Sequence, residues 1–144
     1  ESIQVKWNLT TMIKSILITL SAIVILLIPN TTMAMDVHTY KSICMDENTE
    51  GAQRMLCTEL AVTTVVAYTA GYAEVSANSS AYTCMQALSS EGKQTITRKF
   101  NEYIDRVTGT ELTVQEKKSL KIGMLVKPFL MHNYSSSGCS LTSS

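Results

Sequence analysis

A short apolar segment near the N-terminus determines which part of this chain is left to fold into a domain. Residues 16–28 are Ile, Leu, Val and Ala, interrupted only by one threonine and one serine. Lys14 places a positive charge just before this segment, and Pro29 and a short stretch ending at Ala34 follow it. This order is typical of a secretory signal peptide that is cut after a small residue. We therefore predict a signal peptide over residues 12–34.

A membrane anchor that is never cut is the alternative interpretation of the same segment. The apolar run has 13 residues, whereas a helix that spans a bilayer needs about 20. We therefore favour cleavage and a periplasmic location with no membrane attachment, and secretion from the cell remains an alternative. Residues 1–11 precede the signal, and we predict that they are an upstream extension, with translation starting at Met12.

Residues 35–144 are predicted to form a single helical domain, because a segment of this size can bury one core and hardly two. The segment has eleven acidic and ten basic side chains. A domain that binds nucleic acid usually presents a strongly basic face. The balanced charge therefore argues against a nucleic-acid partner.

All four cysteines of the chain lie in this predicted domain: Cys44, Cys57, Cys84 and Cys139. An even number of cysteines in an exported chain indicates two disulfides. Buried free thiols are the alternative. Zinc is disfavoured because no two cysteines have the close C-x-x-C spacing of a zinc site. We predict no metal and no other cofactor.

Hydrophobic periodicity predicts four helices in this domain. The first covers about residues 36–45, and the second covers about residues 50–76. The second is apolar over a wide arc, with Met55 and Leu56 among the side chains available for burial, which is typical of a central helix. Gly71 lies inside it at a cost of about 1 kcal/mol relative to alanine, so we expect a neighbouring helix to approach closely there.

The second half of the domain is predicted to hold the other two helices. A loop over residues 78–88 leads to an amphipathic helix over about residues 89–107. Thr113 and the glutamate three residues later form a capping box that begins the fourth helix, which Pro128 should kink or end. The tail from about Ser135 is predicted to be flexible except where the last cysteine holds it. The expected fold is all-α, a small four-helix up-and-down bundle with two disulfides.

This topology also predicts which cysteines pair. In an up-and-down bundle the first helix ends where the second begins, which places Cys44 near Cys57. The loop that carries Cys84 and the end of the fourth helix, next to Cys139, lie at the opposite end. We therefore favour the pairs Cys44–Cys57 and Cys84–Cys139 among the three connectivities that four cysteines allow.

No catalytic residues are predicted. A nucleophile needs a base within hydrogen-bond reach, and the only two histidines, His38 and His132, are interpreted as structural or surface residues. Hydrolase, metalloprotease and nucleotide-binding motifs do not occur in the sequence, so a small exported enzyme is a lesser alternative. Four carboxylates that could form acid–base pairs lie in polar segments typical of caps and turns: Glu47 with Glu50, and Glu111 with Glu116.

The four cysteines stand around the predicted helices: Cys44 in the first, Cys57 near the start of the second, Cys84 before the third and Cys139 past the fourth. The second helix also carries the segment Tyr68-Thr69-Ala70-Gly71-Tyr72, and the third has an apolar stripe with Phe100, Tyr103 and Ile104. Together these features resemble the Tai-type immunity proteins, the family that neutralises type VI secretion amidase effectors. The resemblance spans about residues 41–139, which is nearly the whole predicted domain.

The resemblance implies a small periplasmic protein, often dimeric, that binds a peptidoglycan amidase and blocks its active site. We therefore expect a secreted cell-wall amidase as the partner, with a homodimer as a further association. A protruding loop with a few anchoring side chains suits such inhibition. We predict that residues 78–84 are the inserting loop, with Tyr82 as the exposed anchor and with Asn78 and Ser80 beside it. The alternative is that Tyr82 belongs to the core, together with the tyrosines of the second helix.

A second class of function is also open. HdeA-like acid-stress chaperones are small, exported, helical and disulfide-bonded too. Their mechanism needs many carboxylates that titrate between neutral and low pH and release an apolar dimer surface. The charge balance and the two histidines of this chain indicate no special acid switch. We therefore favour the immunity protein.

Overall fold

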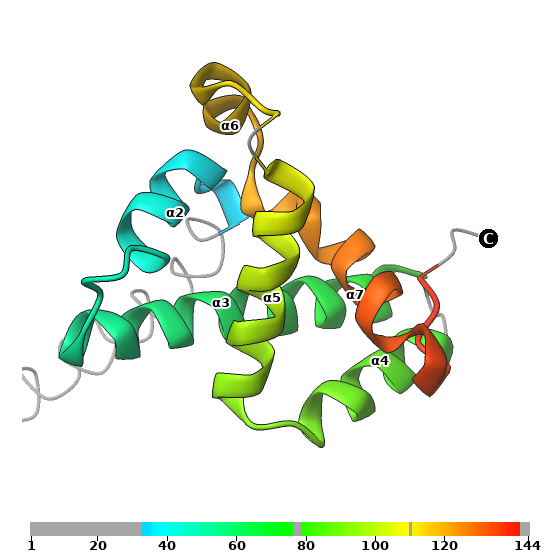
Figure 1. The fold of residues 1–144 in the computed structure, drawn as a ribbon. Helices are drawn as coiled ribbons and strands as arrows, with labels where there is room; N and C mark the ends of the chain where they lie inside the picture. Colours follow the sequence, from blue (N-terminus) through cyan, green and yellow to red (C-terminus); the bar gives the residue numbers. More distant parts are fainter. Residues whose placement is uncertain (1–32, 77–78, 110, 142–144) are drawn as a thin grey trace, which may run out of the picture. The chain divides into compact units, whose positions relative to one another are not determined.

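The computed structural model describes residues 33–76, 79–109 and 111–141 (Figure 1). The predicted upstream extension and nearly all of the predicted signal peptide lie outside these residues, as does Asn78. The described chain is mostly helical and has no strands. It contains six α-helices and two 3-10 turns in this order: α2 (Val37–Cys44), α3 (Gly51–Ser76), α4 (Ser79–Ser89), α5 (Lys93–Thr108), α6 (Val114–Ser119), η1 (Ile122–Leu125), α7 (Val126–Tyr134) and η2 (Ser135–Ser137).

The all-α class is therefore confirmed, whereas the four-helix up-and-down bundle is not. Figure 1 shows α3 as the long helix that α5 crosses, and α3 also packs against α4, α7 and α2. This agrees with the prediction of a central helix with several apolar sides. None of the described helices is long and apolar enough to cross a bilayer.

The first helix follows its prediction closely. The carboxylate of Asp36 caps α2, because Oδ1 accepts the backbone N–H of Thr39 at 2.8 Å and Oδ2 accepts the Thr39 hydroxyl at 3.0 Å. The Thr39 backbone N–H is the main cause that lowers the pKa of Asp36 from its ordinary value of 3.8. Val37, Tyr40 and Cys44 form the buried stripe of the helix, at the spacing of one helical face.

The predicted loop over residues 78–88 is wrong, because the chain forms α4 there. Its buried side chains, Ala81, Cys84 and Leu88, are spaced three and four residues apart, so one face of the segment packs into the core. Ser89 is the last residue of α4 and Ser90 lies in the turn that follows, so neither starts the next helix. Gly92 is the N-cap of α5 instead.

The predicted fourth helix is interrupted. The capping box at Thr113 is confirmed, with the Thr113 backbone N–H donating to Glu116 Oε2 at 2.7 Å, but α6 ends at Ser119. The next residues are extended, because Val37 N–H donates to Leu120 O at 2.8 Å and Ile122 N–H donates to Met35 O at 2.9 Å. These backbone hydrogen bonds tie the start of the domain to its last third.

Pro128 neither kinks nor ends a helix, contrary to the prediction. It lies in the first turn of α7, where the missing N–H of proline removes no helical hydrogen bond. The tail beyond α7 is held in place more firmly than predicted, since Leu141 is fully buried.

Aromatic rings hold the core together. Phe129 of α7 has its ring centroid 5.0 Å from Phe100, 5.8 Å from Tyr103 and 5.8 Å from Tyr134. Phe100 also contacts Tyr40 of α2 at 6.3 Å. Edge-to-face pairs at these distances add to the stabilisation from buried area. The cluster therefore joins α2, α5 and α7 over the central helix.

Candidate functional site

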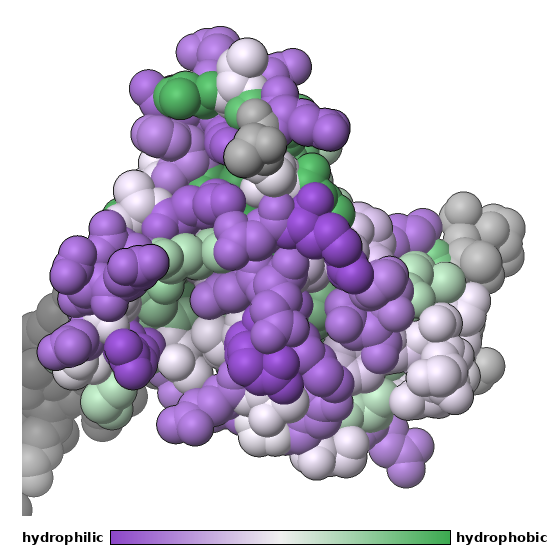
Figure 2. All heavy atoms as spheres, in the orientation of Figure 1, coloured by the Kyte–Doolittle hydropathy of each residue, from purple (hydrophilic) through white to green (hydrophobic). Residues whose placement is uncertain are grey.

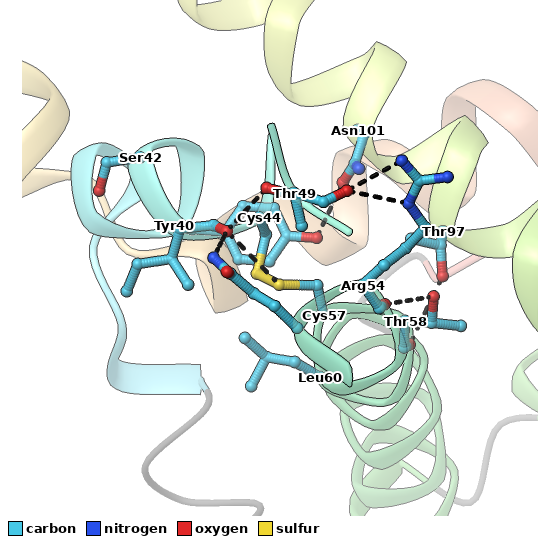
Figure 3. The surroundings of a disulfide bond; sticks show 12 residues. Tyr40, Ser42, Cys44, Thr49, Arg54, Cys57, Thr58, Leu60, Thr97 and Asn101 are labelled. Carbon is cyan, nitrogen blue, oxygen red and sulfur yellow. Dashed lines mark hydrogen bonds between the residues drawn. A yellow bond between two sulfur atoms is a disulfide. The ribbon is translucent and has the colours of Figure 1, made fainter. Parts of the chain in front are cut away.

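A groove of about 890 Å³ lies where the end of α2, the start of α3 and the flank of α5 meet. The disulfide Cys44–Cys57 (Figure 3) and the side chain of Met45 give it an apolar surface, and the exposed Met55 also lines it. The bond is the predicted one, with the two Cα atoms 5.3 Å apart. It fixes the start of α3 against the end of α2.

Hydrogen bonds hold the turn between α2 and α3 in one arrangement. The Thr49 hydroxyl donates to Ile43 O at 3.2 Å, and Gln53 Nε2 donates to the same oxygen at 2.7 Å. Arg54 donates from Nε and Nη2 to Thr49 O at 3.0 and 2.9 Å. Figure 3 shows the Arg54 side chain extending from α3 beside Thr49, near Asn101 of α5. The wall of the groove is therefore preorganised.

Two ion pairs also line the groove, one between α3 and α5 and one within α5. Lys93 Nζ contacts both carboxylate oxygens of Glu59 at 2.6 and 2.9 Å, and Arg98 contacts Glu102 at 2.8 Å. All four side chains are more than half exposed, so each pair adds little stability. Figure 2 shows that hydrophilic residues dominate this side of the molecule over α5. Arg54 has no carboxylate partner in the described part of the chain.

Met55 and Leu56 are the main correction to the predicted core. Both were expected to be available for burial, but they are 72% and 70% exposed. Residues 51–56 at the start of α3 are all exposed, and Cys57 is the first buried side chain of the helix. Met55 borders the groove, whereas Leu56 does not. Large exposed apolar side chains that lie together are typical of surfaces that bind a partner.

The residues predicted for partner contact lie elsewhere. Tyr82 is 64% exposed, as predicted, but it belongs to α4 and not to an inserting loop. The Ser80 hydroxyl donates to Ser140 O, which ties the start of α4 to the tail. The disulfide Cys84–Cys139 is also the predicted one and joins α4 to the same tail. The structure therefore does not bring Tyr82 to the groove.

A partly buried ion pair lies at the junction of α5 and α7. Lys99 pairs with Glu91 Oε1, and the Tyr134 hydroxyl donates to Glu91 Oε2 at 2.9 Å. Lys99 Nζ also lies 4.9 Å from the centroid of the Tyr134 ring. Burial and the neighbouring carboxylate raise the pKa of Tyr134. The hydroxyl therefore remains a hydrogen-bond donor at neutral pH.

The remaining titratable candidates are not brought together. His132 is exposed on α7 beside Tyr103, and His38 is half-buried on α2. Glu116 is held by the Thr113 hydroxyl and backbone, which lower its pKa. Among the described residues there is no free cysteine and no group of three acidic, histidine or cysteine side chains that could hold a metal ion.

Comparisons with protein-family models, with characterised proteins and with solved structures find no match to this chain. The groove could not have been predicted from local sequence, because its residues come from three separate segments. One weak signal was present in the sequence, because Met55 and Leu56 directly precede Cys57 and a disulfide there would hold them near the first helix.

Proposed function

We propose that this chain is a periplasmic immunity protein that binds a secreted peptidoglycan amidase and occludes its active site. The partner class comes from the resemblance of the cysteine and tyrosine pattern to the Tai-type proteins. The observation that supports a binding role is the groove beside Cys44–Cys57, which a disulfide and hydrogen bonds hold in place and which the exposed Met55 lines. The resemblance also implies that the chain forms a homodimer, which is part of the same proposal.

The physical properties of the groove suit an interface. Interfaces combine an apolar anchor with a polar rim, and here Met55 adjoins Arg54 and the Glu59–Lys93 pair. The disulfide and the bonds to Thr49 and Ile43 O fix the wall before a partner arrives, which lowers the entropy lost on binding. Methionine adapts its shape to an irregular partner surface. Its full burial contributes about 2 kcal/mol.

Tyr82 supports a second contact surface within the same proposal. It is exposed on α4, close to the disulfide of Cys84. Tyrosine buries a large ring at little cost in side-chain entropy. Ser80, also on α4, and Asn78, which lies outside the described residues, remain predicted contact residues beside Tyr82. If α4 is the element that blocks the amidase cleft, binding requires Tyr82 and not Met55. Mutation of each residue therefore distinguishes the two surfaces.

The test begins with the partner. The oxidised chain is immobilised and incubated with periplasmic and secreted proteins of the producing organism, and the retained proteins are identified by mass spectrometry. Stoichiometric capture of one amidase, which the free chain then inhibits on purified peptidoglycan, supports the proposal. Retention of no amidase at neutral pH contradicts it. Retention of many unrelated proteins only at low pH favours the acid chaperone.

The contact surface is then tested with matched variants. We expect Met55→Asp to weaken amidase binding at least tenfold. Met124→Asp is the control, because Met124 is also an exposed methionine, 65% accessible, and it lies outside the groove. Tyr82→Ala tests the second surface. Unchanged affinity in both Met55→Asp and Tyr82→Ala would remove both surfaces from the proposal.

A further inference from the structure

The start of the described chain lies against a segment from the last third of the domain. Residues 33–37, which we call the N-terminal strap, run antiparallel to residues 120–123 through the bridge between Asp36 and Lys121. The two backbone hydrogen bonds described above, at 2.8 and 2.9 Å, flank this bridge. The Met35 side chain also packs against the hydrophobic core. The strap is therefore part of the folded domain.

Gly123 is the residue on which the strap begins. A Cβ atom added at Gly123 would lie 2.9 Å from Met33 O, 3.1 Å from Met33 Cβ and 3.3 Å from Met33 Cα. At every other glycine of the described residues an added Cβ atom would stay 3.4 Å or more from its neighbours. Gly123 does not have a positive φ, so its backbone conformation does not require glycine. The close approach of Met33 does require it.

The bond between Ala34 and Met35, at which we predict the signal peptide to be cut, lies inside the strap. Met33 packs on Gly123 on one side of this bond, and Met35 O accepts the Ile122 N–H on the other side. Proteases cut exposed segments whose backbone is free to enter the protease cleft in extended form. Met33 and Ala34 have helical backbone, although the Ala34 side chain is exposed. The docked strap therefore does not present the bond in the form that a protease needs.

We propose that folding closes the processing site: once the strap has docked, the Ala34–Met35 bond is no longer hydrolysed. Cutting must then precede docking. A chain that is cut first loses Met33 and leaves Gly123 uncovered, whereas a chain that docks first keeps its apolar segment, residues 16–28. The order of the two events decides whether the domain is released from that segment. The proposal rests on the predicted cut after Ala34 and is independent of the amidase proposal.

Elastase tests the docked strap, because its small specificity pocket accepts alanine and the enzyme can therefore cut after Ala34. The folded, oxidised full chain in detergent micelles and a synthetic peptide of residues 28–40 carry the same bond, and only the full chain can dock it. We expect cutting at this bond, identified by mass spectrometry, to be at least tenfold slower in the full chain. Equal rates would overturn the proposal, because the strap would then be a free linker.

Two matched variants separate protection by docking from shielding by the micelle. Gly123→Ala displaces Met33 and should raise the rate of cutting in the full chain at least fivefold. Gly71→Ala is the control, because the close helix approach predicted at Gly71 does not occur among the described residues: a Cβ atom there would meet no atom within 4 Å. The control should leave the rate unchanged. Equal rates in the two variants would contradict the role of Gly123.

Hydrogen exchange in the wild-type chain is the second measurement, and it decides the case if Gly123→Ala does not fold. The Ile122 N–H donates to the strap, and the Val37 N–H donates from the strap to Leu120 O. Both amides should exchange at least tenfold more slowly than in an unfolded peptide. Rapid exchange of both amides in the folded chain would overturn the docked strap.

Signal peptidase then tests the consequence for processing. We expect it to cut a synthetic peptide of residues 12–40 after Ala34 at least tenfold faster than it cuts the folded full chain. Equal rates would overturn the proposed order of cutting and docking. Cutting of neither substrate would overturn the predicted cut after Ala34, on which the proposal rests. None of these measurements involves an amidase, so failure of the immunity proposal would be seen separately, in the capture experiment.

Discussion

Removal of the two disulfides should destabilise the chain unequally. The cysteines of Cys84–Cys139 are 55 residues apart, and those of Cys44–Cys57 are 13 apart. A disulfide stabilises mainly by restricting the unfolded chain, and a longer loop loses more freedom. The chain-entropy estimate gives about 4 kcal/mol for the longer loop and about 3 kcal/mol for the shorter one. Either loss is a large part of the stability of a domain this size.

Differences in side-chain burial do not change which disulfide is expected to stabilise the chain more. All four sulfur-bearing side chains are buried, between 0% and 8% exposed, so a change to alanine leaves a similar small space at each site. The longer bridge also holds the tail that buries Leu141. We expect the variant Cys84→Ala/Cys139→Ala to lose this anchorage as well, which adds to the difference.

Urea denaturation of the wild type and of the two double variants measures the effect. The midpoint should fall furthest in Cys84→Ala/Cys139→Ala. The dependence of the unfolding free energy on urea should increase in both variants, because the unfolded chain exposes more surface without its bridge. A larger loss in Cys44→Ala/Cys57→Ala, or losses below about 1 kcal/mol in both, would refute the argument from loop length.

Three further predictions concern single groups. Tyr134→Phe removes the hydrogen bond to Glu91 and should lower the free energy of unfolding by about 2 kcal/mol. Tyr68→Phe is the matched control, and an equal loss in this variant would contradict the stabilising role of the Glu91 contact. The pKa values of Asp36 and Glu116 are lowered in the folded chain from unfolded values of 3.8 and 4.5. The two ionised carboxylates therefore stabilise the fold above these unfolded values, and this stabilisation is lost as the pH falls through the folded values. Urea midpoints should drop below about pH 4.5, and the drop should be smaller in Asp36→Asn/Glu116→Gln. Gly123→Ala would place a Cβ atom 2.9 Å from Met33 O. In a chain that retains Met33, the substitution should lower the free energy of unfolding by about 1–3 kcal/mol. In a chain cut after Ala34, the same substitution should leave the thermal unfolding temperature nearly unchanged.

Sequence pattern predicted the elements whose signals are local. The long apolar run of α3, the Asp36 cap and the Thr113 capping box each depend on a few neighbouring residues. α4 was missed because its serines and threonine favour loops by propensity, while tertiary packing of Leu88 and the residues on its face decided the outcome. The prediction of one continuous fourth helix was wrong, because the helix is interrupted where the backbone bonds to Met35, more than eighty residues earlier.

The candidate site was less predictable than the fold. The disulfide pairing was correct although Cys84 lies in a helix, since the argument needed only the end of the domain at which each cysteine lies. The exposure of Met55 was not predictable, because it depends on how far α2 and α5 cover the first turns of α3. Local pattern identifies an apolar side chain, but only the packed neighbours determine whether it is covered.

Both disulfides join cysteines that are consecutive in the sequence, the first with the second and the third with the fourth. In the export that we propose, the chain would emerge from its N-terminal end, so Cys44 and Cys57 would enter an oxidising compartment before the other two cysteines. An oxidase that joins thiols in their order of emergence then forms the native pairs directly. No wrong bond has to be reduced and exchanged, which removes a step that otherwise takes seconds to hours. With this order of pairing, an exported chain would mature even where an oxidase is present and an isomerase is scarce.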